Sequence, residues 1–314
     1  MSGVGRTKRS RTASATAASR SLETFWLQEK THTATVTPRA ATAMGAELAG
    51  GGLTAPVPNM YTTPQAAPAV EQCLALARHK RSKRRVAALY PSEADEQAVS
   101  ITQADLEDLA EGSELSDCLV DVCLRQFRDK LHAPERCVVL DALWLWAAKV
   151  DVDAVARVSV HLLDADFIYV PMCERGHWAG AVVCRNPDSS YRILVLDSMR
   201  RGQSPLDPRP PCEALAEAVK ATWRAHRPGA CPRVDWVAVM EVPMQPNVVD
   251  CALYMMALFA RHNATLQPLH LQRKPRWGGG IFRHSRIQEM RDQLRHTLLA
   301  CKVQQALEKS EGHD

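Results

Sequence analysis

The chain has 314 residues, of which 46% are hydrophobic and 24% are charged, a composition typical of globular proteins. The formal net charge is only +4, but residues 1–90 carry 13 Lys and Arg against 4 Asp and Glu. No apolar run reaches the roughly 20 residues of a membrane-spanning helix, and no secretory leader follows Met1, so no membrane partner is expected. The ten cysteines are scattered without a CxxC pair, which speaks against a zinc ribbon and favours reduced thiols in a reducing compartment.

Residues 1–90 are expected to form a disordered, basic N-terminal tail, because their Ala-, Thr-, Ser-, Pro- and Gly-rich composition buries too little apolar surface to offset chain entropy. The basic cluster at 78–85 is typical of a nuclear-import signal or a nucleic-acid patch, and equally of a solvated charge run. Five basic residues and no acidic residue precede Glu23, as in organelle presequences. A nuclear, a cytoplasmic and an organelle location therefore all stay open.

Residues 91–310 are expected to form one folded domain. The predicted elements, in chain order, are a helix capped by Thr102, a helix within 115–131, an apolar segment at 138–150, strands at 167–170, 179–183 and 193–196, a helix at 213–225, a strand at 234–242, and helices at 252–260 and 287–307. A polar turn cluster at 185–190 separates the second and third strands, so these two should form a hairpin. Helices, then strands, then helices indicate an α+β fold.

Three segments place polar residues where nucleophilic catalysis would need them. His177 opens a predicted strand, Asp197 closes the next one, and Cys251 begins an apolar helix. A helix N-terminus stabilises a thiolate, and its free N–H groups can hold an oxyanion. An imidazole can take the thiol proton, and a carboxylate can orient that imidazole. Gln245, six residues before Cys251, could supply a second oxyanion donor.

Taken singly, each of these residues has a simpler interpretation. A histidine on a strand is more often a structural residue, and a cysteine within an apolar helix usually packs in the core. Asp197 followed by Ser198 would usually be a turn residue. Their joint order and context favour the catalytic interpretation.

The motifs His177-Trp178, Leu196-Asp197-Ser198 and Gln245-x-Asn247-x-x-Asp250-Cys251 resemble the signature of the Ulp/sentrin-specific cysteine protease family, which processes SUMO and related modifiers. The resemblance implies a papain-like α+β fold, with a central, mostly antiparallel sheet flanked by helices, in a catalytic domain at 91–310. It implies that Cys251 is the nucleophile, His177 the general base and acid, Asp197 the orienting carboxylate and Gln245 the oxyanion donor. It further implies hydrolysis after the C-terminal Gly-Gly of a ubiquitin-like modifier, with SUMO as the first candidate. It implies no cofactor and no metal.

The chain departs from the family pattern at three places. Ala252 stands where the family usually has glycine, and its methyl group could crowd the leaving side of the scissile bond. Glu114 stands where the family has a tryptophan that walls the Gly-Gly tunnel opposite Trp178, whereas Asp117 of the same element is retained. The strand residues at 179–181 are smaller than in the family. Glu114, Asp117 and Trp178 are therefore the expected substrate-binding residues.

These departures keep other functions open. The same fold and thiol chemistry could act on another ubiquitin-like modifier or on ordinary peptides. A catalytically weak modifier-binding protein is a further alternative, although a pure binder would not need all four catalytic residues. A nucleic-acid partner rests on the basic tail alone and is the least favoured.

Overall fold

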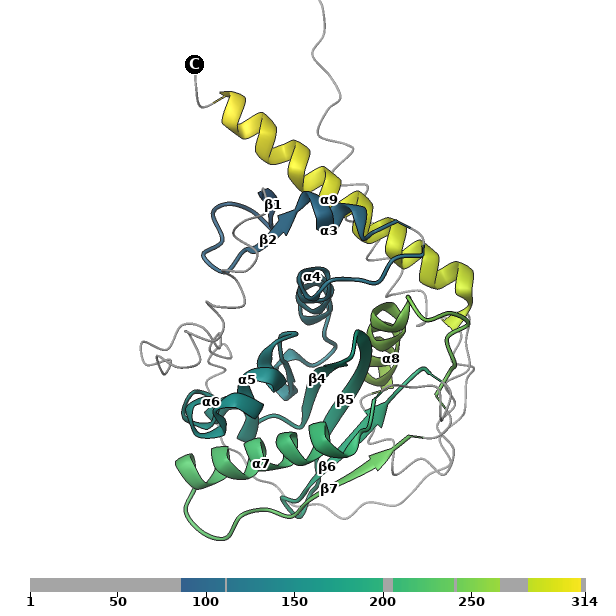
Figure 1. Cartoon of the computed structure of the whole chain (residues 1–314). Coiled ribbons are helices and arrows are strands. Elements are labelled where there is room, and N and C mark those ends of the chain that lie inside the picture. Colours follow the sequence, from purple (N-terminus) through teal and green to yellow (C-terminus); the bar gives the residue numbers. More distant parts are fainter. Residues whose placement is uncertain (1–85, 111, 200–205, 240–241, 266–281, 312–314) are drawn as a thin grey trace, which may run out of the picture. The chain divides into compact units, whose positions relative to one another are not determined.

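The computed structural model describes residues 86–110, 112–199, 206–239, 242–265 and 282–311 (Figure 1). The predictions made for the tail at 1–85 lie outside these residues. The first strand begins at Val86, four residues before the predicted start of the folded domain at Tyr90–Pro91. Within the described ranges, no helix is both long and apolar enough to cross a membrane.

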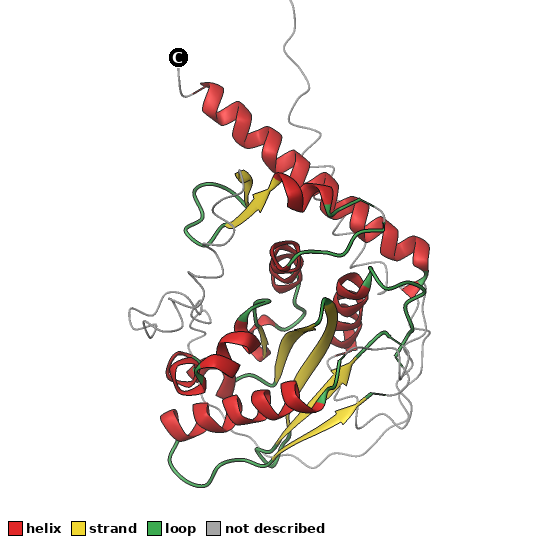
Figure 2. Cartoon of the chain, in the orientation of Figure 1, coloured by secondary structure: helices red, strands yellow, loops and turns green. Residues whose placement is uncertain are grey.

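A five-stranded sheet forms the centre of the described structure, with the strand order β3-β4-β5-β6-β7 (Figure 2). These strands are β3 (Cys137–Val139), β4 (Phe167–Glu174), β5 (His177–Arg185), β6 (Tyr191–Leu196) and β7 (Val234–Ala238). The predicted hairpin is confirmed, because β5 pairs with β6 antiparallel, as β4 does with β5. The two outer pairings, β3–β4 and β6–β7, are parallel. The α+β class with a helix-flanked central sheet is therefore confirmed, and the sheet is antiparallel at its centre and parallel at both edges.

Helical crossovers account for the two parallel pairings. The chain passes from β3 to β4 through α5 (Trp144–Val150), α6 (Val152–Val158) and the 3₁₀ turn η3 (Val160–Leu163). It passes from β6 to β7 through α7 (Arg209–His226). Each helical connection carries the chain back to the side of the sheet where the preceding strand began. The next strand therefore runs parallel to it. The predicted helix at 213–225 is confirmed as the central part of α7.

Each face of the sheet is covered by a different set of helices. Alternate residues of the central strands, among them Ile168, Ala181 and Ile193, pack against α5, α6 and α7. On the other face, Tyr169 of β4 contacts Phe127 of α4 (Asp117–Arg128) and Phe259 of α8 (Cys251–Thr265), with ring centroids 5.0 and 5.3 Å apart. Since side chains alternate along a strand, both faces can be apolar, and the core lies on both sides of the sheet.

Gly180, in the middle of β5, allows α8 to lie close against the sheet. A Cβ atom at this position would lie 2.5 Å from Cε1 of Phe259 and 3.2 Å from Cγ of Met255. Both residues belong to α8, so the aromatic ring occupies the space that any larger residue would need. The small residues noted at 179–181 thus have a packing role at position 180.

A second, two-stranded sheet pairs β1 (Val86–Tyr90) with β2 (Val99–Thr102). Thr102 also caps α3 (Gln103–Glu107), and Asp105 completes a capping box, which confirms the predicted helix start. The last helix, α9 (His284–Glu311), packs on β1, where the Gln305 side chain accepts a 3.0 Å hydrogen bond from the Leu89 N–H. The predicted apolar face of α9 is buried at Ile287, Met290, Leu294 and Leu298.

Candidate active site

His177 and Asp197 lie side by side because of the pairing of β5 with β6. His177 is the first residue of β5, and Asp197 directly follows the last residue of β6. The start of one antiparallel strand is adjacent to the end of its neighbour, so the two side chains share one edge of the sheet. Nε2 of His177 lies 2.8 Å from Oδ1 of Asp197. The same oxygen accepts a 2.9 Å hydrogen bond from the N–H of Met199, which orients the carboxylate.

The environment of His177 favours the protonated ring. Only 4% of the residue is exposed. Burial alone lowers the pKa of His177, but the hydrogen bond with Asp197, the neighbouring Cys251 thiol and the negative charge of both groups raise this pKa to about 9. The other ring nitrogen, Nδ1, is buried and has no hydrogen-bond partner among the described residues. This nitrogen is therefore free to exchange a proton with the thiol.

Cys251 is the first residue of α8 and is 1% exposed. The carbonyl of Asp250 accepts a 3.0 Å hydrogen bond from the N–H of Tyr254, so the helical hydrogen-bond pattern begins directly before the cysteine. The thiol thus lies at the positive end of the helix dipole, where a thiolate is stabilised. By contrast, burial within β5 raises the pKa of the Cys184 thiol to about 12. Ala252, the next residue of α8, is also fully buried.

Three hydrogen bonds hold Gln245 beside this group. Its N–H donates to the carbonyl of Ser198 at 2.9 Å, and its Oε1 accepts from the Ser198 hydroxyl at 2.5 Å. Its Nε2 donates to the carbonyl of Asn247 at 2.6 Å. Because Ser198 follows Asp197, this pairing joins the loop before Cys251 to the end of β6. The amide nitrogen keeps a second hydrogen that this contact does not use.

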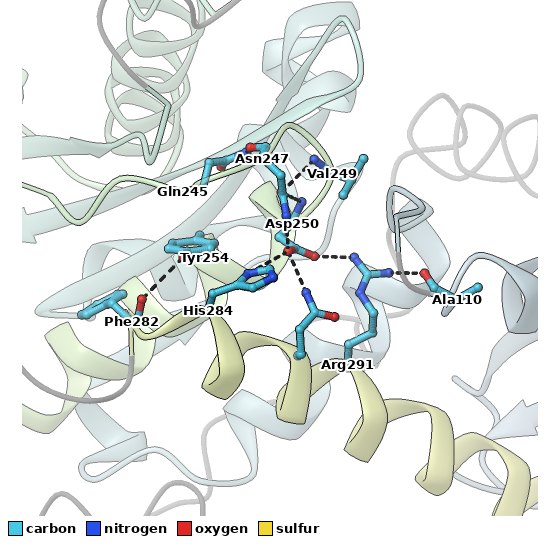
Figure 3. Close-up of polar contacts among 10 residues, drawn as sticks. Ala110, Gln245, Asn247, Val249, Asp250, Tyr254, Phe282, His284 and Arg291 are labelled. Atoms are coloured by element: carbon cyan, nitrogen blue, oxygen red, sulfur yellow. Dashed lines mark hydrogen bonds and ion pairs between the residues drawn. The ribbon is translucent and has the colours of Figure 1, made fainter.

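A polar network around Asp250 completes the start of α8 (Figure 3). Oδ1 of Asn247 accepts hydrogen bonds from the N–H groups of Val249 and Asp250 at 3.2 and 3.1 Å. Nδ2 of Asn247 donates to the Asp250 carboxylate at 2.7 Å. Arg291 of α9 pairs with the other oxygen of that carboxylate, also at 2.7 Å. The Gln-to-Cys motif contained Asn247 and Asp250 without indicating a role for them, and no sequence signal pointed to Arg291.

The predicted substrate-binding residues lie in the loop before α4, at the start of α4 and on β5. Trp178 is buried, and its Nε1 donates a 3.3 Å hydrogen bond to the carbonyl of Leu115. Glu114 is exposed, and its Oε2 lies 3.3 Å from the position of a Cβ atom on Gly176, in the turn before His177. Asp117 lies further along the chain, in the first turn of α4. The structure thus brings Glu114 and Trp178 to the hairpin that carries His177.

Comparisons with known proteins agree with this fold. Residues 148–302 match the family model of the Ulp1 protease family, C-terminal catalytic domain. No curated protein sequence matches the chain significantly. A solved structure of a de-sumoylating protease is similar with a TM-score of 0.54 and 14% identity, over 71% of this chain and 95% of that chain. A structure of the SUMO protease Ulp1, with its catalytic cysteine oxidized to a sulfonic acid, is similar with a TM-score of 0.50 and 16% identity, over 74% of this chain and 94% of that chain.

The two solved structures show the shared fold, and the matched segment contains His177, Asp197, Gln245 and Cys251. Among the described residues, no group of His, Cys, Asp and Glu side chains could hold a metal ion. Residues 148–302 therefore belong to a catalytic domain of the Ulp1 protease family, and the chain is a cysteine peptidase that acts on ubiquitin-like proteins.

Proposed function

We propose that the chain hydrolyses the peptide or isopeptide bond after the C-terminal Gly-Gly of a SUMO-type modifier, through a triad of Cys251, His177 and Asp197. One observation carries this proposal. The buried His177 ring contacts the Asp197 carboxylate through Nε2 at 2.8 Å, and its pKa is raised by both Asp197 and the Cys251 thiol. A histidine between a carboxylate and a thiol at a helix N-terminus is the arrangement that thiol proteolysis requires.

In the acylation step, Nδ1 of His177 holds the proton given up by the Cys251 thiol, and Sγ attacks the carbonyl carbon of the second glycine. The negative charge that forms on the carbonyl oxygen is stabilised by N–H groups at the start of α8 and by the amide of Gln245. The C–N bond then breaks, and the departing amine takes the proton from His177. The products of this step are a free amine and a thioester on Cys251.

In the deacylation step, a water molecule gives a proton to His177 while its oxygen attacks the thioester carbonyl. The C–S bond breaks, the thiolate of Cys251 leaves, and the modifier departs with a free carboxyl group. Asp197 keeps the same hydrogen bond to Nε2 throughout and holds the ring in one orientation. The raised pKa of His177 suits this role, because the imidazolium must persist until the amine leaves.

SUMO is the first candidate modifier because the two similar solved structures are a de-sumoylating protease and the SUMO protease Ulp1. The test is to incubate the full chain with a panel of ubiquitin-like proteins that carry a C-terminal electrophile. We expect a covalent adduct with SUMO at Cys251, located by peptide mass mapping, and none with Cys251→Ser. A SUMO adduct at another cysteine would refute the assigned nucleophile. Labelling by a different modifier alone would refute the assigned substrate.

A further inference from the structure

A buried ion pair joins the residue before the proposed nucleophile to the C-terminal helix. Asp250 is 0% exposed and Arg291 is 1% exposed, and Nη2 of Arg291 lies 2.7 Å from Oδ1 of Asp250 (Figure 3). We propose that Arg291 is a positioning residue, which neutralises Asp250 and anchors the first turn of α8 so that the Cys251 thiol stays within reach of His177. The inference rests on the proposed role of Cys251.

The Asp250 carboxylate is turned toward α9 and the preceding loop. Its Oδ2 accepts hydrogen bonds from Nδ2 of Asn247 at 2.7 Å and from Nε2 of Gln288 at 2.9 Å. Nδ1 of His284 lies 3.8 Å from the same oxygen. A carboxylate at this position would usually cap the free N–H groups of the helix. With both oxygens engaged by these side chains, the N–H groups of the first turn are left for a thiolate or an oxyanion.

The guanidinium of Arg291 also reaches a third segment. Its Nη1 donates to the carbonyls of Asp108 and Ala110 at 3.1 and 3.3 Å, directly after α3. One side chain therefore links the end of α3, the start of α8 and the body of α9. A lysine could keep the charge, but its single ammonium group lacks the planar fork that donates to two carbonyls and one carboxylate.

Stability alone does not account for this pair. Replacing a buried ion pair by neutral residues often leaves a protein as stable as before, because burying two charges is costly. The position of the pair, however, has two consequences for Cys251. An unpaired carboxylate one residue away would disfavour the thiolate, so Arg291 removes an electrostatic penalty. Its hydrogen bonds also fix the backbone from which the thiol projects, and small displacements of reacting groups are costly.

These two effects can be separated with three variants of the full chain. Arg291→Met removes both the charge and the bridge. The double variant Asp250→Asn/Arg291→Met removes both charges together, so that the loss of the bridge is its only remaining effect. Arg291→Lys keeps the charge with fewer contacts. The matched control is Arg286→Met, on the same helix, whose side chain pairs with Glu289 of that helix.

Three quantities are measured for each variant. Thermal unfolding reports folding, and cleavage of a modifier C-terminal amide gives kcat and KM. The third quantity is the rate of Cys251 alkylation by iodoacetamide as a function of pH, resolved from the other cysteines by peptide mass mapping. Alkylation needs no modifier, so its outcome is independent of whether the proposed substrate is correct. If no modifier is cleaved, the limiting alkylation rate replaces kcat.

For Arg291→Met, we expect the midpoint of the alkylation profile to rise by about one pH unit, because the carboxylate is left unpaired. In the double variant, the midpoint should return to the wild-type value, while kcat stays about tenfold or more below wild type and KM changes by less than about twofold. Arg291→Lys should keep the midpoint and show an intermediate kcat. Arg286→Met should match wild type throughout.

Two results would overturn the inference. One is a folded double variant with wild-type kcat, which would make the pair purely structural. The other is a folded Arg291→Met protein whose alkylation profile coincides with that of Arg286→Met. If Arg291→Met does not fold, the double variant and Arg291→Lys decide the question by their kcat values, since both avoid an unpaired buried carboxylate.

Discussion

The hydrogen bond between His177 and Asp197 should make the stability of the protein depend on pH in a defined window. The pKa of His177 is about 9 in the folded protein, against 6.5 for an ordinary histidine. At about 1.4 kcal/mol per pH unit, this difference corresponds to about 3 kcal/mol of folding free energy. Because the folded pKa is the higher one, the contribution is complete below about pH 6.5 and is lost as the pH rises through about 9.

Asp197→Asn should abolish most of this dependence. The variant leaves the ring buried beside a neutral amide, and burial alone lowers the pKa of His177. Urea unfolding of the full chain in reducing buffer, at intervals between pH 6 and pH 9.5, gives the free energy of unfolding of each protein. The wild type should exceed the variant by up to about 3 kcal/mol at pH 6, because Cys251 also contributes to the raised pKa, and the difference should shrink steadily toward pH 9.5. Titrating groups that are unaffected by the substitution contribute equally to the free energy of unfolding of both proteins, so their contributions cancel in the difference.

The matched control for this experiment is Asp188→Asn, in the turn between β5 and β6. Asp188 accepts hydrogen bonds from the N–H and the hydroxyl of Ser190, at 3.0 and 2.6 Å, and is far along the hairpin from His177. This substitution should change stability by an amount that is the same from pH 6 to pH 9.5. Parallel stability curves for wild type and Asp197→Asn, or a difference that grows with pH, would refute the assignment of the raised pKa to this pair.

Three further predictions concern the oxyanion, the substrate channel and the tail. Gln245→Ala should lower kcat about a hundredfold in a steady-state assay if its amide stabilises the oxyanion, and an unchanged kcat would assign that task to backbone N–H groups alone. Glu114→Trp should lower KM for Gly-Gly substrates and sharpen their selection over tails with a larger penultimate residue, whereas identical selectivity would place residue 114 outside the channel. Replacing the basic residues of cluster 78–85 with alanine should move a fluorescently tagged protein out of the nucleus, and loss of organelle import on deleting residues 1–22 would instead indicate a presequence.

Local features of the fold could be predicted because they depend on neighbouring residues. The Thr102 cap requires only the residue that follows three positions later, Asp105, and the structure contains this capping box. The hairpin of β5 and β6 follows from two short apolar runs separated by a polar turn cluster. The approach of His177 to Asp197 then follows from the same hairpin, since its register places the start of one strand beside the end of the other.

Features that join distant segments could not be predicted in this way. The parallel pairing of β6 with β7 depends on how α7 packs on the sheet, and no pattern within either strand specifies it. Arg291 lies 41 positions after Asp250, on a helix whose other Arg and Lys residues are partly or fully exposed, so its burial has no signature in the sequence. The start of the first strand at Val86 was also missed, because that strand directly follows a basic cluster and is stabilised by Gln305 of α9.

The absence of a side chain at Gly180 links core packing to the rate of the reaction. β5 carries both this glycine and His177, and α8 carries both Phe259 and Cys251. The spacing between β5 and α8 therefore affects the separation of the proposed base, His177, and the proposed nucleophile, Cys251. Substitutions at Phe259 or Met255, both buried in the core, would alter this spacing and are expected to change turnover more than affinity. Engineering that fills or enlarges this part of the core would accordingly adjust the catalyst as well as its stability.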